Sequence, residues 1–483
     1  MLTALVCVLS SSRADAEVVF ERMELTIDRP IDAWIDADLD GDGDADLILF
    51  DDPHTARTGL HRATVIRQEP TGRYAVAQKR DLALADSGGV YELADVAGDA
   101  TKELVQMSRN GVRYYTFSGD HFLPDSQVLI HDALPPQLPA VSRPRTWDFG
   151  WPIIPNQKEC ILLPYTDRLE MWSPNGKGAY AMSRRLHCGT VCDLSETGDA
   201  TFTMALPELR AMSTPTLMEM FVQSGQRWRG LRRSAPDQTD FTVSLAFDAA
   251  PTETDQLLGI SPDFRAGALL DDLNGDGAPD VVRWNNHGGL NQASCEIDVY
   301  FGPFNTRLPD KPHAQVNVEG VLGFPVFGDL NGDGRKDMVV CAMETGTVAA
   351  AKVFVMKRLG LHLVAYRQRT GNTFSVVADA RESFDYKLDL DTPRPVFGPI
   401  ALFGGDLDGD GLEDLVVQTG EDHLEIFLGD ANKMFNDDSP ERLTCARAVA
   451  IESKDIDGDG RRDLFLYHGN DGTTSKFTAL LTR

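Results

Sequence analysis

Acidic side chains recur along the chain in one nine-residue pattern, Asp-x-Asp/Asn-x-Asp-Gly-x-x-Asp, which occurs five times. The copies occupy residues 38–46, 272–280, 329–337, 406–414 and 455–463. Oxygen ligands at alternate positions of a tight loop, with glycine at position 6 for the turn, suit Ca²⁺. The pattern therefore predicts that the side chains at positions 1, 3, 5 and 9, and the backbone carbonyl at position 7, surround one Ca²⁺ per loop.

The predicted metal ligands comprise five residues in each loop. They are Asp38, Asp40, Asp42, Asp44, Asp46, Asp272, Asn274, Asp276, Ala278, Asp280, Asp329, Asn331, Asp333, Arg335, Asp337, Asp406, Asp408, Asp410, Leu412, Asp414, Asp455, Asp457, Asp459, Arg461 and Asp463. Without a cation, the carboxylates of one loop would repel one another over a few ångströms. We therefore expect about five Ca²⁺ as the cofactor, which would change the formal charge from −28 to about −18.

The residues around the loops distinguish them from EF-hands, in which a bidentate glutamate at position 12 lies beside flanking helices. Position 12 is occupied here by side chains that cannot bind Ca²⁺, namely Leu49, Arg283, Val340, Val417 and Leu466. Each closing Asp instead begins an apolar, β-rich run, such as Asp46-Leu-Ile-Leu-Phe. These runs are typical of buried strands, so we expect each loop to lead into a strand.

A repeating unit of loop, strand, turn and strand extends beyond the five complete loops. Degenerate copies near residues 95–103, 148–160 and 193–202 keep the rhythm but lack the full ligand set. The eight units then recur with a period of roughly 50 residues, which fits propeller blades better than a solenoid. Two longer separations predict insertions near residues 226–262 and 359–395.

The expected fold class is all-β: a β-propeller of eight four-stranded antiparallel blades, with seven blades as the alternative. Residues 17–28 supply a strand without a unit of its own, and the chain stops one strand short after residues 476–483. Pairing the two ends would close the ring and remove exposed strand edges. Residues 17–483 are therefore predicted to form a single domain.

The N-terminal end favours export from the cytoplasm. Residues 1–16 form an apolar run that ends in Ala14-Asp15-Ala16, typical of a signal peptide and its cleavage site. No Lys or Arg precedes the run, so an ordinary buried strand is the alternative. No later segment has the ~18 apolar residues of a membrane span. The mature chain is therefore expected to be secreted, periplasmic or on the cell surface.

The charge and the cysteines exclude other classes of protein. Asp and Glu number 74 against 46 Lys and Arg, an excess that opposes binding to nucleic acid or anionic lipid. Six cysteines beyond the leader are too sparse for a disulfide framework. Cys188 and Cys192 are read as a local disulfide or two buried thiols, whereas Cys160 and Cys341 lie in apolar runs and read as core.

The five loops, with Phe327-Gly328 and Phe403-Gly404-Gly405 ahead of two of them, resemble the FG-GAP/VCBS repeat family. Blades of this family also build the propeller of integrin α chains. The resemblance covers most of the chain, strongly in five repeats and weakly in three. It implies a β-propeller that holds Ca²⁺ through positions 1, 3, 5, 7 and 9. The family includes adhesion domains, lectin-like binders and polysaccharide-active enzymes, so the resemblance implies no single activity.

The remaining residues favour a binding role over catalysis. The chain has no nucleophile elbow, HExxH motif, phosphate loop or dinucleotide fingerprint, so its catalytic residues, if any, are unknown. One basic cluster contains Trp228, Arg229 and Arg232, which could bind an anionic glycan or an acidic partner. The alternative is that Trp228 packs between blades. We expect a binding module for a protein or glycan ligand, with a calcium-dependent polysaccharide lyase as the alternative.

Overall fold

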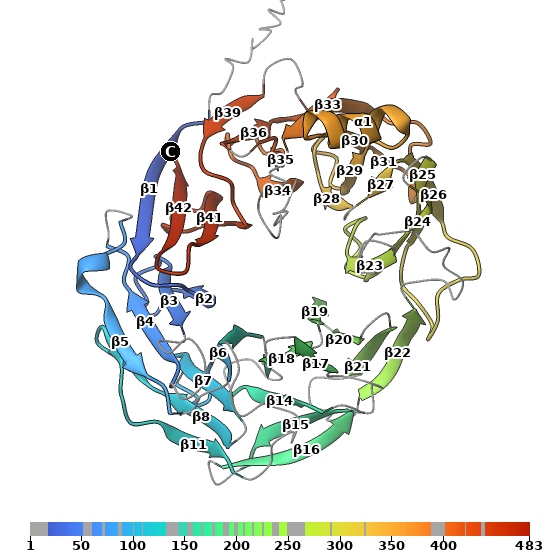
Figure 1. Ribbon diagram of the computed structural model, residues 1–483. Coiled ribbons are helices and arrows are strands. Elements are labelled where there is room, and N and C mark those ends of the chain that lie inside the picture. Colours follow the sequence, from blue (N-terminus) through green and yellow to red (C-terminus); the bar gives the residue numbers. More distant parts are fainter. Residues whose placement is uncertain are drawn as a thin grey trace, which may run out of the picture.

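A computed structural model of the chain shows β-sheets arranged in a ring around a central axis (Figure 1). The structure describes residues 18–51, 60–69, 73–85, 89–99, 101–108, 110–131, 144–147, 149–151, 158–165, 168–175, 179–186, 193–197, 201–205, 208–214, 217–224, 227–233, 241–248, 266–289, 292–322, 325–387, 401–420, 422–435 and 440–483. The predicted signal peptide, residues 1–16, lies outside these ranges.

Eight sheets follow one another around the ring in the described part of the chain, each formed mainly by four antiparallel strands. Blades 1 to 4 contain, in order, β2 (Ala33–Ala37), β3 (Asp46–Asp51), β4 (Arg62–Ile66) and β5 (Arg80–Ala83); β6 (Val90–Ala94), β7 (Glu103–Ser108), β8 (Gly111–Tyr115) and β11 (Gln127–Ile130); β13 (Gly150–Trp151), β14 (Cys160–Pro164), β15 (Leu169–Pro174) and β16 (Tyr180–Leu186); β19 (Glu208–Thr214), β20 (Leu217–Ser224), β21 (Arg227–Arg233) and β22 (Phe241–Asp248).

Blades 5 to 8 complete the ring. They contain β23 (Ala266–Asp271), β24 (Asp280–Gly289), β25 (Gln292–Tyr300) and β26 (Ala314–Glu319); β27 (Val321–Leu322) with β28 (Val326–Gly328), β29 (Asp337–Met343), β30 (Arg358–Tyr366) and β33 (Ala380–Lys387); β34 (Ala401–Gly405), β35 (Asp414–Val417), β36 (His423–Phe427) and β39 (Glu441–Thr444); β40 (Ala450–Lys454), β41 (Asp463–Asn470), β42 (Ser475–Thr482) and β1 (Phe20–Ile27). The predicted all-β propeller with eight blades is confirmed.

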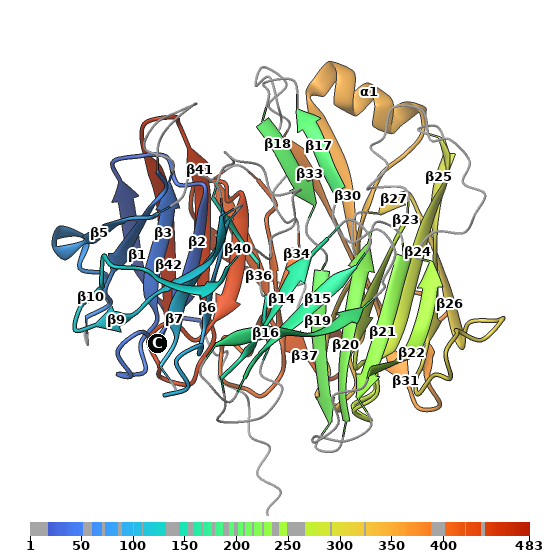
Figure 2. The same cartoon turned by 90° about the horizontal axis from the view of Figure 1, so that it is seen from below.

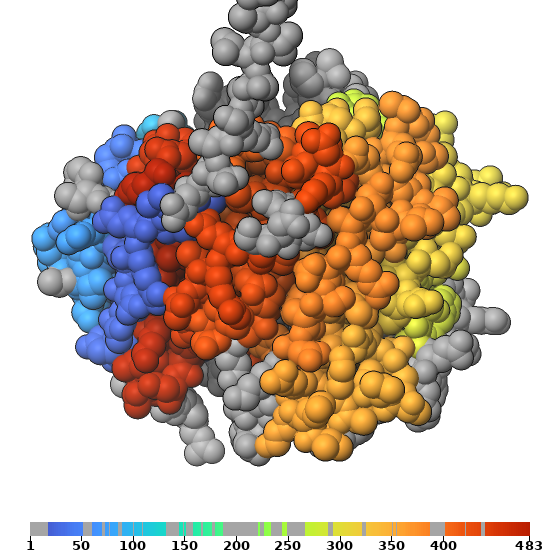
Figure 3. Space-filling model, turned by 90° about the horizontal axis from the view of Figure 1, so that it is seen from above, coloured from blue at the N-terminus to red at the C-terminus, as the bar shows by residue number. Residues whose placement is uncertain are grey.

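The two ends of the chain close the ring within blade 8, as predicted. Strand β1 pairs antiparallel with β42, from Phe20 opposite Thr482 to Ile27 opposite Ser475. On the outer surface the N-terminal strand, in blue, lies beside the C-terminal segments in red (Figure 3). Backbone donors and acceptors that would otherwise form two exposed strand edges are therefore paired with each other.

The hydrophobic core is divided among the interfaces between neighbouring blades. The second strand of each metal-loop blade begins with at least three buried residues, and Asp46–Asp51 is buried along its length, because a blade covers the strand on either side. One cluster joins Ile48 and Phe50 of blade 1 to Tyr91 and Leu104 of blade 2. This two-sided burial explains why the runs after the closing Asp are continuously apolar rather than alternating.

Several elements go beyond the expected unit. Helix α1 (Thr347–Met356) is inserted between β29 and β30, and hairpin β17 (Asp193–Thr197) with β18 (Thr201–Ala205) forms a separate sheet. Both project from the same face of the ring (Figure 2). Three further hairpins connect third to fourth strands: β9 (Phe117–Ser118) with β10 (His121–Phe122), β31 (Gln368–Arg369) with β32 (Thr373–Phe374), and β37 (Gly429–Asp430) with β38 (Met434–Phe435).

The predicted insertions need correction. Residues 227–233 and 241–248 are strands of blade 4, and residues 358–366 and 380–387 are strands of blade 6. The extra length in blade 6 comes from α1 and a hairpin between its strands. Asp193–Thr197, expected as a degenerate metal loop, is instead a strand of the separate hairpin. Among the described residues, no helix is long and apolar enough to cross a membrane.

The four cysteines that the structure describes form no disulfide with one another. Cys160, Cys295 and Cys445 are buried, and Cys341 is half-buried. Burial raises the pKa of Cys295 and of Cys341 to about 12, so neither is a reactive thiolate. The core reading of Cys160 agrees with its position, whereas Cys188 and Cys192 lie outside the described residues.

Candidate metal centres

All five predicted loops occupy the same place in their blades, between the first and the second strand. The loop at 38–46 joins β2 to β3, and the loop at 455–463 joins β40 to β41. The other three lie between β23 and β24, β28 and β29, and β34 and β35. Blades 5, 6, 7, 8 and 1 are consecutive in the closed ring. The predicted metal sites therefore form one uninterrupted arc, and blades 2, 3 and 4 form the metal-poor remainder.

Two glycines give each loop its shape, at positions 4 and 6. Gly409 and Gly411 have φ of 78° and 87°, and the corresponding pairs in the other four loops are also left-handed. Side chains rarely adopt this backbone conformation, so glycine is favoured at both positions. The sequence analysis predicted the turn from the glycine at position 6 and missed the one at position 4. That glycine is also present in all five copies of the repeat, so the sequence could have shown it.

The acidic side chains fold each loop around themselves. In the loop at 406–414, Asp406 accepts hydrogen bonds from the backbone N–H of Gly409 at 2.7 Å and of Gly411 at 2.9 Å. Asp408 accepts from the N–H of Asp410 at 3.1 Å, and Asp410 accepts from the N–H of Leu412 at 2.9 Å. These bonds aim oxygens from positions 1, 3 and 5 toward the inside of one turn.

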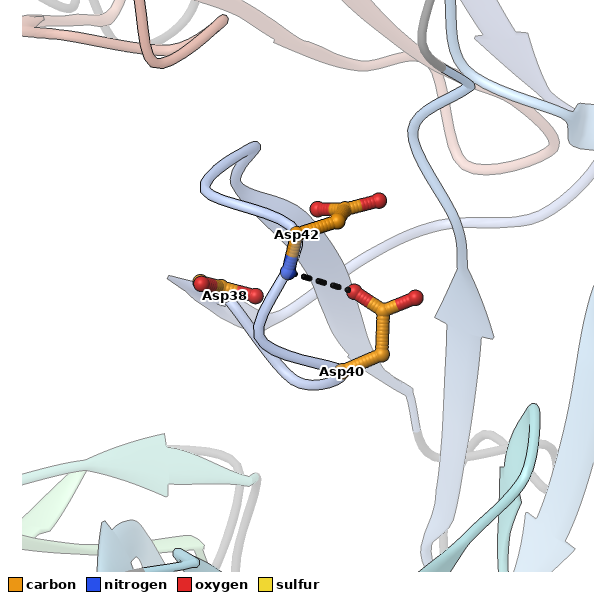
Figure 4. Close-up of side chains that lie close together, drawn as sticks. All are labelled: Asp38, Asp40 and Asp42. Atoms are coloured by element: carbon orange, nitrogen blue, oxygen red, sulfur yellow. Dashed lines mark hydrogen bonds between the residues drawn. The ribbon is translucent and has the colours of Figure 1, made fainter.

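The first loop repeats this arrangement at 38–46. Figure 4 shows the carboxylates of Asp38, Asp40 and Asp42 around the turn, with the N–H of Asp42 donating to Asp40 at 3.3 Å. One oxygen from each of these three residues lies within 4.8 Å of the others. The same closeness is found for Asp406, Asp408 and Asp414, and for Asp455, Asp457 and Asp463.

The closing Asp at position 9 anchors the loop to the rest of its blade. Asp414 accepts from the N–H of Leu407 at 2.7 Å, within the loop, and from the N–H of Gly429 at 2.9 Å, beyond the third strand. Asp280 and Asp463 accept equivalent pairs of backbone bonds. Position 9 therefore fixes the loop against two strands in addition to offering oxygens to a metal.

Burial makes the ionised form of these closing carboxylates expensive in the absence of a cation. It raises the pKa of Asp280, Asp337 and Asp414 to about 7, although backbone N–H donors and, for Asp337, Asn331 act in the opposite direction. Burial likewise raises the pKa of Asp46 and Asp463 to about 6. Neighbouring loop carboxylates add to the increase, and a bound cation would remove it.

The donor set fits a hard divalent cation. Every predicted side-chain ligand can offer an oxygen atom to the metal, and Ca²⁺ binds six to eight oxygen ligands. In the loop at 455–463, one carboxylate oxygen of Asp455 and one of Asp457 are buried without a hydrogen-bond partner among the described residues. Buried carboxylate oxygens are normally satisfied, so these two are what a cation in this loop would coordinate.

Arginines approach the ligand carboxylates of several loops. Inside two loops, Arg335 lies 2.6 Å from Asp333 and Arg461 lies 3.3 Å from Asp459. Two further arginines come from outside the motif. The guanidinium of Arg67, just after β4, pairs with Asp40 and lies 3.0 Å from an oxygen of Asp46. Arg483 pairs with Asp457 of the adjacent loop and with Glu21 at 3.1 Å. Neither arginine was identified from the sequence, because each lies about 20 or more residues from the motif it approaches.

The degenerate loop at 95–103 keeps the hydrogen bonds that shape the turn but lacks the full set of metal ligands. Asp95 accepts from the N–H of Gly98, and Glu103 takes the place of the closing Asp by accepting from Val96 and Ala97 at 3.0 Å each. Position 3 is Ala97, which offers no side-chain oxygen. Asp148, in the second degenerate copy, lies outside the described residues.

Adjacent metal loops are hydrogen-bonded to each other along the arc. The N–H of Ala45 donates to the carbonyl of Ile456 at 2.9 Å, and the N–H of Lys336 donates to that of Leu273 at 2.8 Å. The N–H of Glu413 likewise donates to the carbonyl of Asp329 at 3.1 Å. At these three of the four junctions in the arc, position 8 of one loop thus contacts position 1 or 2 of the loop before it.

Two buried glutamines reinforce these connections at equivalent places in blades 1 and 6. With its amide oriented to satisfy both atoms, Gln368 donates to the carbonyls of Leu273 and Lys336, both at 2.8 Å. Gln68 in the same way reaches Ile456 and Ala45. Each glutamine also donates its own N–H, at 2.8 Å, to the closing Asp of its blade. Sequence reasoning missed both residues, since neither belongs to the repeated motif.

The basic cluster on β21 is only partly suited to ligand binding. Trp228 is 0% exposed and its ring stacks on Phe247 at a centroid distance of 6.2 Å, so its prediction as a surface contact is corrected. The alternating pleat of β21 turns Trp228 into the core between blades. Arg229 and Arg232 are partly exposed on the same strand and stay candidates.

Comparisons with known proteins agree with this architecture. The family model described as an FG-GAP-like repeat matches residues 272–340 and 406–466. These two segments contain four of the five loops. No curated protein matches the chain.

Solved structures of two lectins align over most of the chain at low identity. A lectin from Agrocybe aegerita that recognises non-reducing terminal N-acetylglucosamine is 14% identical, covers 92% of this chain and 99% of its own, and has a TM-score of 0.41. The BP39L lectin from Burkholderia pseudomallei is 10% identical, with 82% and 96% coverage and a TM-score of 0.36. Similarity at this level carries no argument about ligands. The chain is therefore an eight-bladed β-propeller, and its residues 272–340 and 406–466 are similar to the FG-GAP-like repeat.

Proposed function

We propose that this protein is a calcium-binding propeller that works outside the cytoplasm as a binding module for a glycan or protein ligand. The observation that carries the proposal is the arc of five preformed oxygen cages in consecutive blades. One buried oxygen each of Asp455 and Asp457, without a hydrogen-bond partner in the described part of the chain, supports occupation by a cation. Millimolar Ca²⁺ outside cells would suit such sites, and the apolar leader at residues 1–16 supports export.

Calcium has a structural task in this proposal. Each ion would tie positions 1, 3 and 5 of a loop to the closing Asp, which is itself bonded to the third strand. The N–H groups of Lys336 and Glu413 connect the loops of blades 5, 6 and 7, and the N–H of Ala45 connects those of blades 8 and 1. Filling the sites would therefore stiffen each of these two groups of blades. A stiff ring presents a preorganised surface, which reduces the entropy lost when a ligand binds.

A glycan array read with added Ca²⁺, and again with chelator, tests the binding role. We expect calcium-dependent retention of one class of glycan without chemical change. Product analysis on any glycan retained then distinguishes the two functional classes: new reducing or unsaturated ends would replace the module by the lyase, and unchanged glycan supports the module.

Mass spectrometry of the protein purified from its native host tests export separately. Cleavage after Ala16 would give a mature chain that begins at Glu17. Recovery of the intact N-terminus from the cytoplasmic fraction would contradict export while leaving the calcium sites and the binding role unaffected.

A further inference from the structure

A pocket of about 440 Å³ opens near the axis of the ring, outside the metal loops. It is lined by Asp32, Ala33, Trp34, Pro144, Arg145, Thr146 and Glu452. Its volume falls in the range of about 300–1,000 Å³ that is usual for small-molecule sites. Sequence reasoning missed the pocket, since its residues come from three distant parts of the chain and share no motif.

The pocket exists because blade 2 has a fifth strand. Strand β12 (Arg145–Thr146) runs parallel to β6, the first strand of blade 2, with Arg145 opposite Val90 and Thr146 opposite Tyr91. First strands lie nearest the axis (Figure 1), so β12 extends blade 2 inward, beside β2 of blade 1. Strand β40 of blade 8 supplies Glu452 on the other side.

An aromatic side chain provides the apolar part of the lining. Trp34 is half-buried, and its ring is held by Tyr467 at a centroid distance of 5.0 Å and by Phe477 at 5.8 Å. An indole fixed in this way cannot turn away when a ligand arrives. It offers a flat apolar surface at the edge of a polar site.

The charged groups of the lining are already balanced. Glu452 lies 3.1 Å from the ammonium of Lys454, which in turn pairs with Asp36 at 2.6 Å. Asp32 and Arg145 are engaged in interactions of their own. A charged ligand would have to break these contacts, and separating partly buried ion pairs is costly. A neutral ligand could instead use the remaining lone pairs and N–H groups without disturbing the pairs.

We propose that this axial pocket binds a neutral sugar, one or two rings in size, with the apolar face of a ring against Trp34. Its hydroxyl groups would donate to the carboxylates of Asp32 and Glu452, accept from Arg145, and exchange bonds with Thr146. Hydroxyl groups both donate and accept, which matches a lining that mixes carboxylates, a guanidinium and a hydroxyl. The inference rests on the proposed binding role and gives that role a place and a ligand class.

An array of neutral and acidic oligosaccharides, read with calcium present, tests the proposal on the full chain. The variants are Thr146→Val, Arg145→Ala and Trp34→Phe. Thr146→Val is nearly isosteric at an exposed edge and should weaken retention of neutral glycans about threefold to tenfold by deleting one hydrogen bond. Arg145→Ala should weaken the retention of neutral glycans more than Thr146→Val does. Trp34→Phe keeps an aromatic ring against Tyr467 but reduces the apolar surface on which the sugar would lie.

Thr373→Val is the matched control, since Thr373 is also exposed in a two-residue strand, β32, but lies in blade 6. Neutral glycans retained by the wild type and by Thr373→Val, and lost from the pocket variants at unchanged melting temperature and calcium content, support the pocket. Equal retention by all variants overturns the pocket and leaves the binding module standing. Retention of acidic glycans only, or of none, also overturns it. Turnover of the glycan would overturn the module itself.

Discussion

At the scale of single residues, the first metal loop has an arginine from outside the motif against two of its predicted calcium ligands. Arg67 places its guanidinium against Asp40 and Asp46, two of the four side-chain ligands predicted there. Ca²⁺ at this loop must displace the guanidinium, so part of its binding energy is spent on breaking an ion pair. Loops without such an arginine, such as the one at 406–414, bind without that cost.

Arg67→Gln should therefore tighten calcium binding at one of the five sites, by about tenfold if one pair of about 1.4 kcal/mol is removed. The same variant should melt at a lower temperature in chelator, since the loop carboxylates lose their only guanidinium partner among the described residues. Calcium titration calorimetry and paired melting curves measure the two effects.

Arg367→Gln provides the control for that experiment. Arg367 occupies the equivalent position in blade 6, but its guanidinium donates to the carbonyls of Ala431 at 3.4 Å and Asn432 at 3.2 Å instead of to a metal loop. Its calcium isotherm should match that of the wild type. Identical calcium-binding isotherms for Arg67→Gln and the wild type would mean that Arg67 is only a structural contact.

A second residue-scale prediction separates complete from degenerate loops. Asp410→Ala removes the position-5 ligand of a complete loop and should cost one Ca²⁺ per molecule, measured by metal analysis after desalting. Asp99→Ala changes the same position of the degenerate loop, where Asp99 bonds only to Thr101 in the described contacts, and should cost none. Equal calcium loss in both variants would contradict the division between the two kinds of loop.

At the scale of elements, the sequence was informative where structure is local. The loops and the strands that start at each closing Asp follow from patterns of nine to about fifty residues, and all are present. The terminal strand pair is not local, and it followed from counting one unmatched strand at each end of the repeats. Helix α1, the separate hairpin at 193–205 and the pocket strand β12 were not foreseen. Exposed Val348 and Val355 make α1 apolar without an amphipathic pattern, and β12 is two residues long, too short to leave a periodic signal.

The glutamine connections belong to this scale, because they join one loop to the next. Gln368→Ala leaves the carbonyl of Lys336 without its glutamine donor, and the carbonyl of Leu273 keeps only the N–H of Lys336. We expect a loss of about 1–3 kcal/mol in the free energy of unfolding. Chemical denaturation measures it. Gln127→Ala at an exposed strand position should change stability by less than about 0.5 kcal/mol. A Gln368→Ala variant as stable as Gln127→Ala would show that backbone bonds alone hold adjacent loops together.

At the scale of the whole molecule, the arc of loops predicts how stability depends on calcium. Each site that binds only the folded ring adds about 2.7 kcal/mol at a hundredfold excess of Ca²⁺ over its dissociation constant. Melting temperature should therefore rise over a range of calcium concentrations and fall in chelator. Superimposable melting curves with calcium and with chelator would exclude the loops as the elements that stabilise the ring.

Closure by β1 and β42 also sets the time at which the molecule can fold. Phe20 is synthesised first and finds its partner only when Thr482 has been added, after about 460 further residues. At roughly 5–20 residues per second, β1 waits on the order of 20–90 s without a sheet. Seven blades can form before β42 has been synthesised, but the eighth cannot, so until then the nascent chain is an open arc with an unpaired strand at one end. The ring closes only after its last strand has left the ribosome.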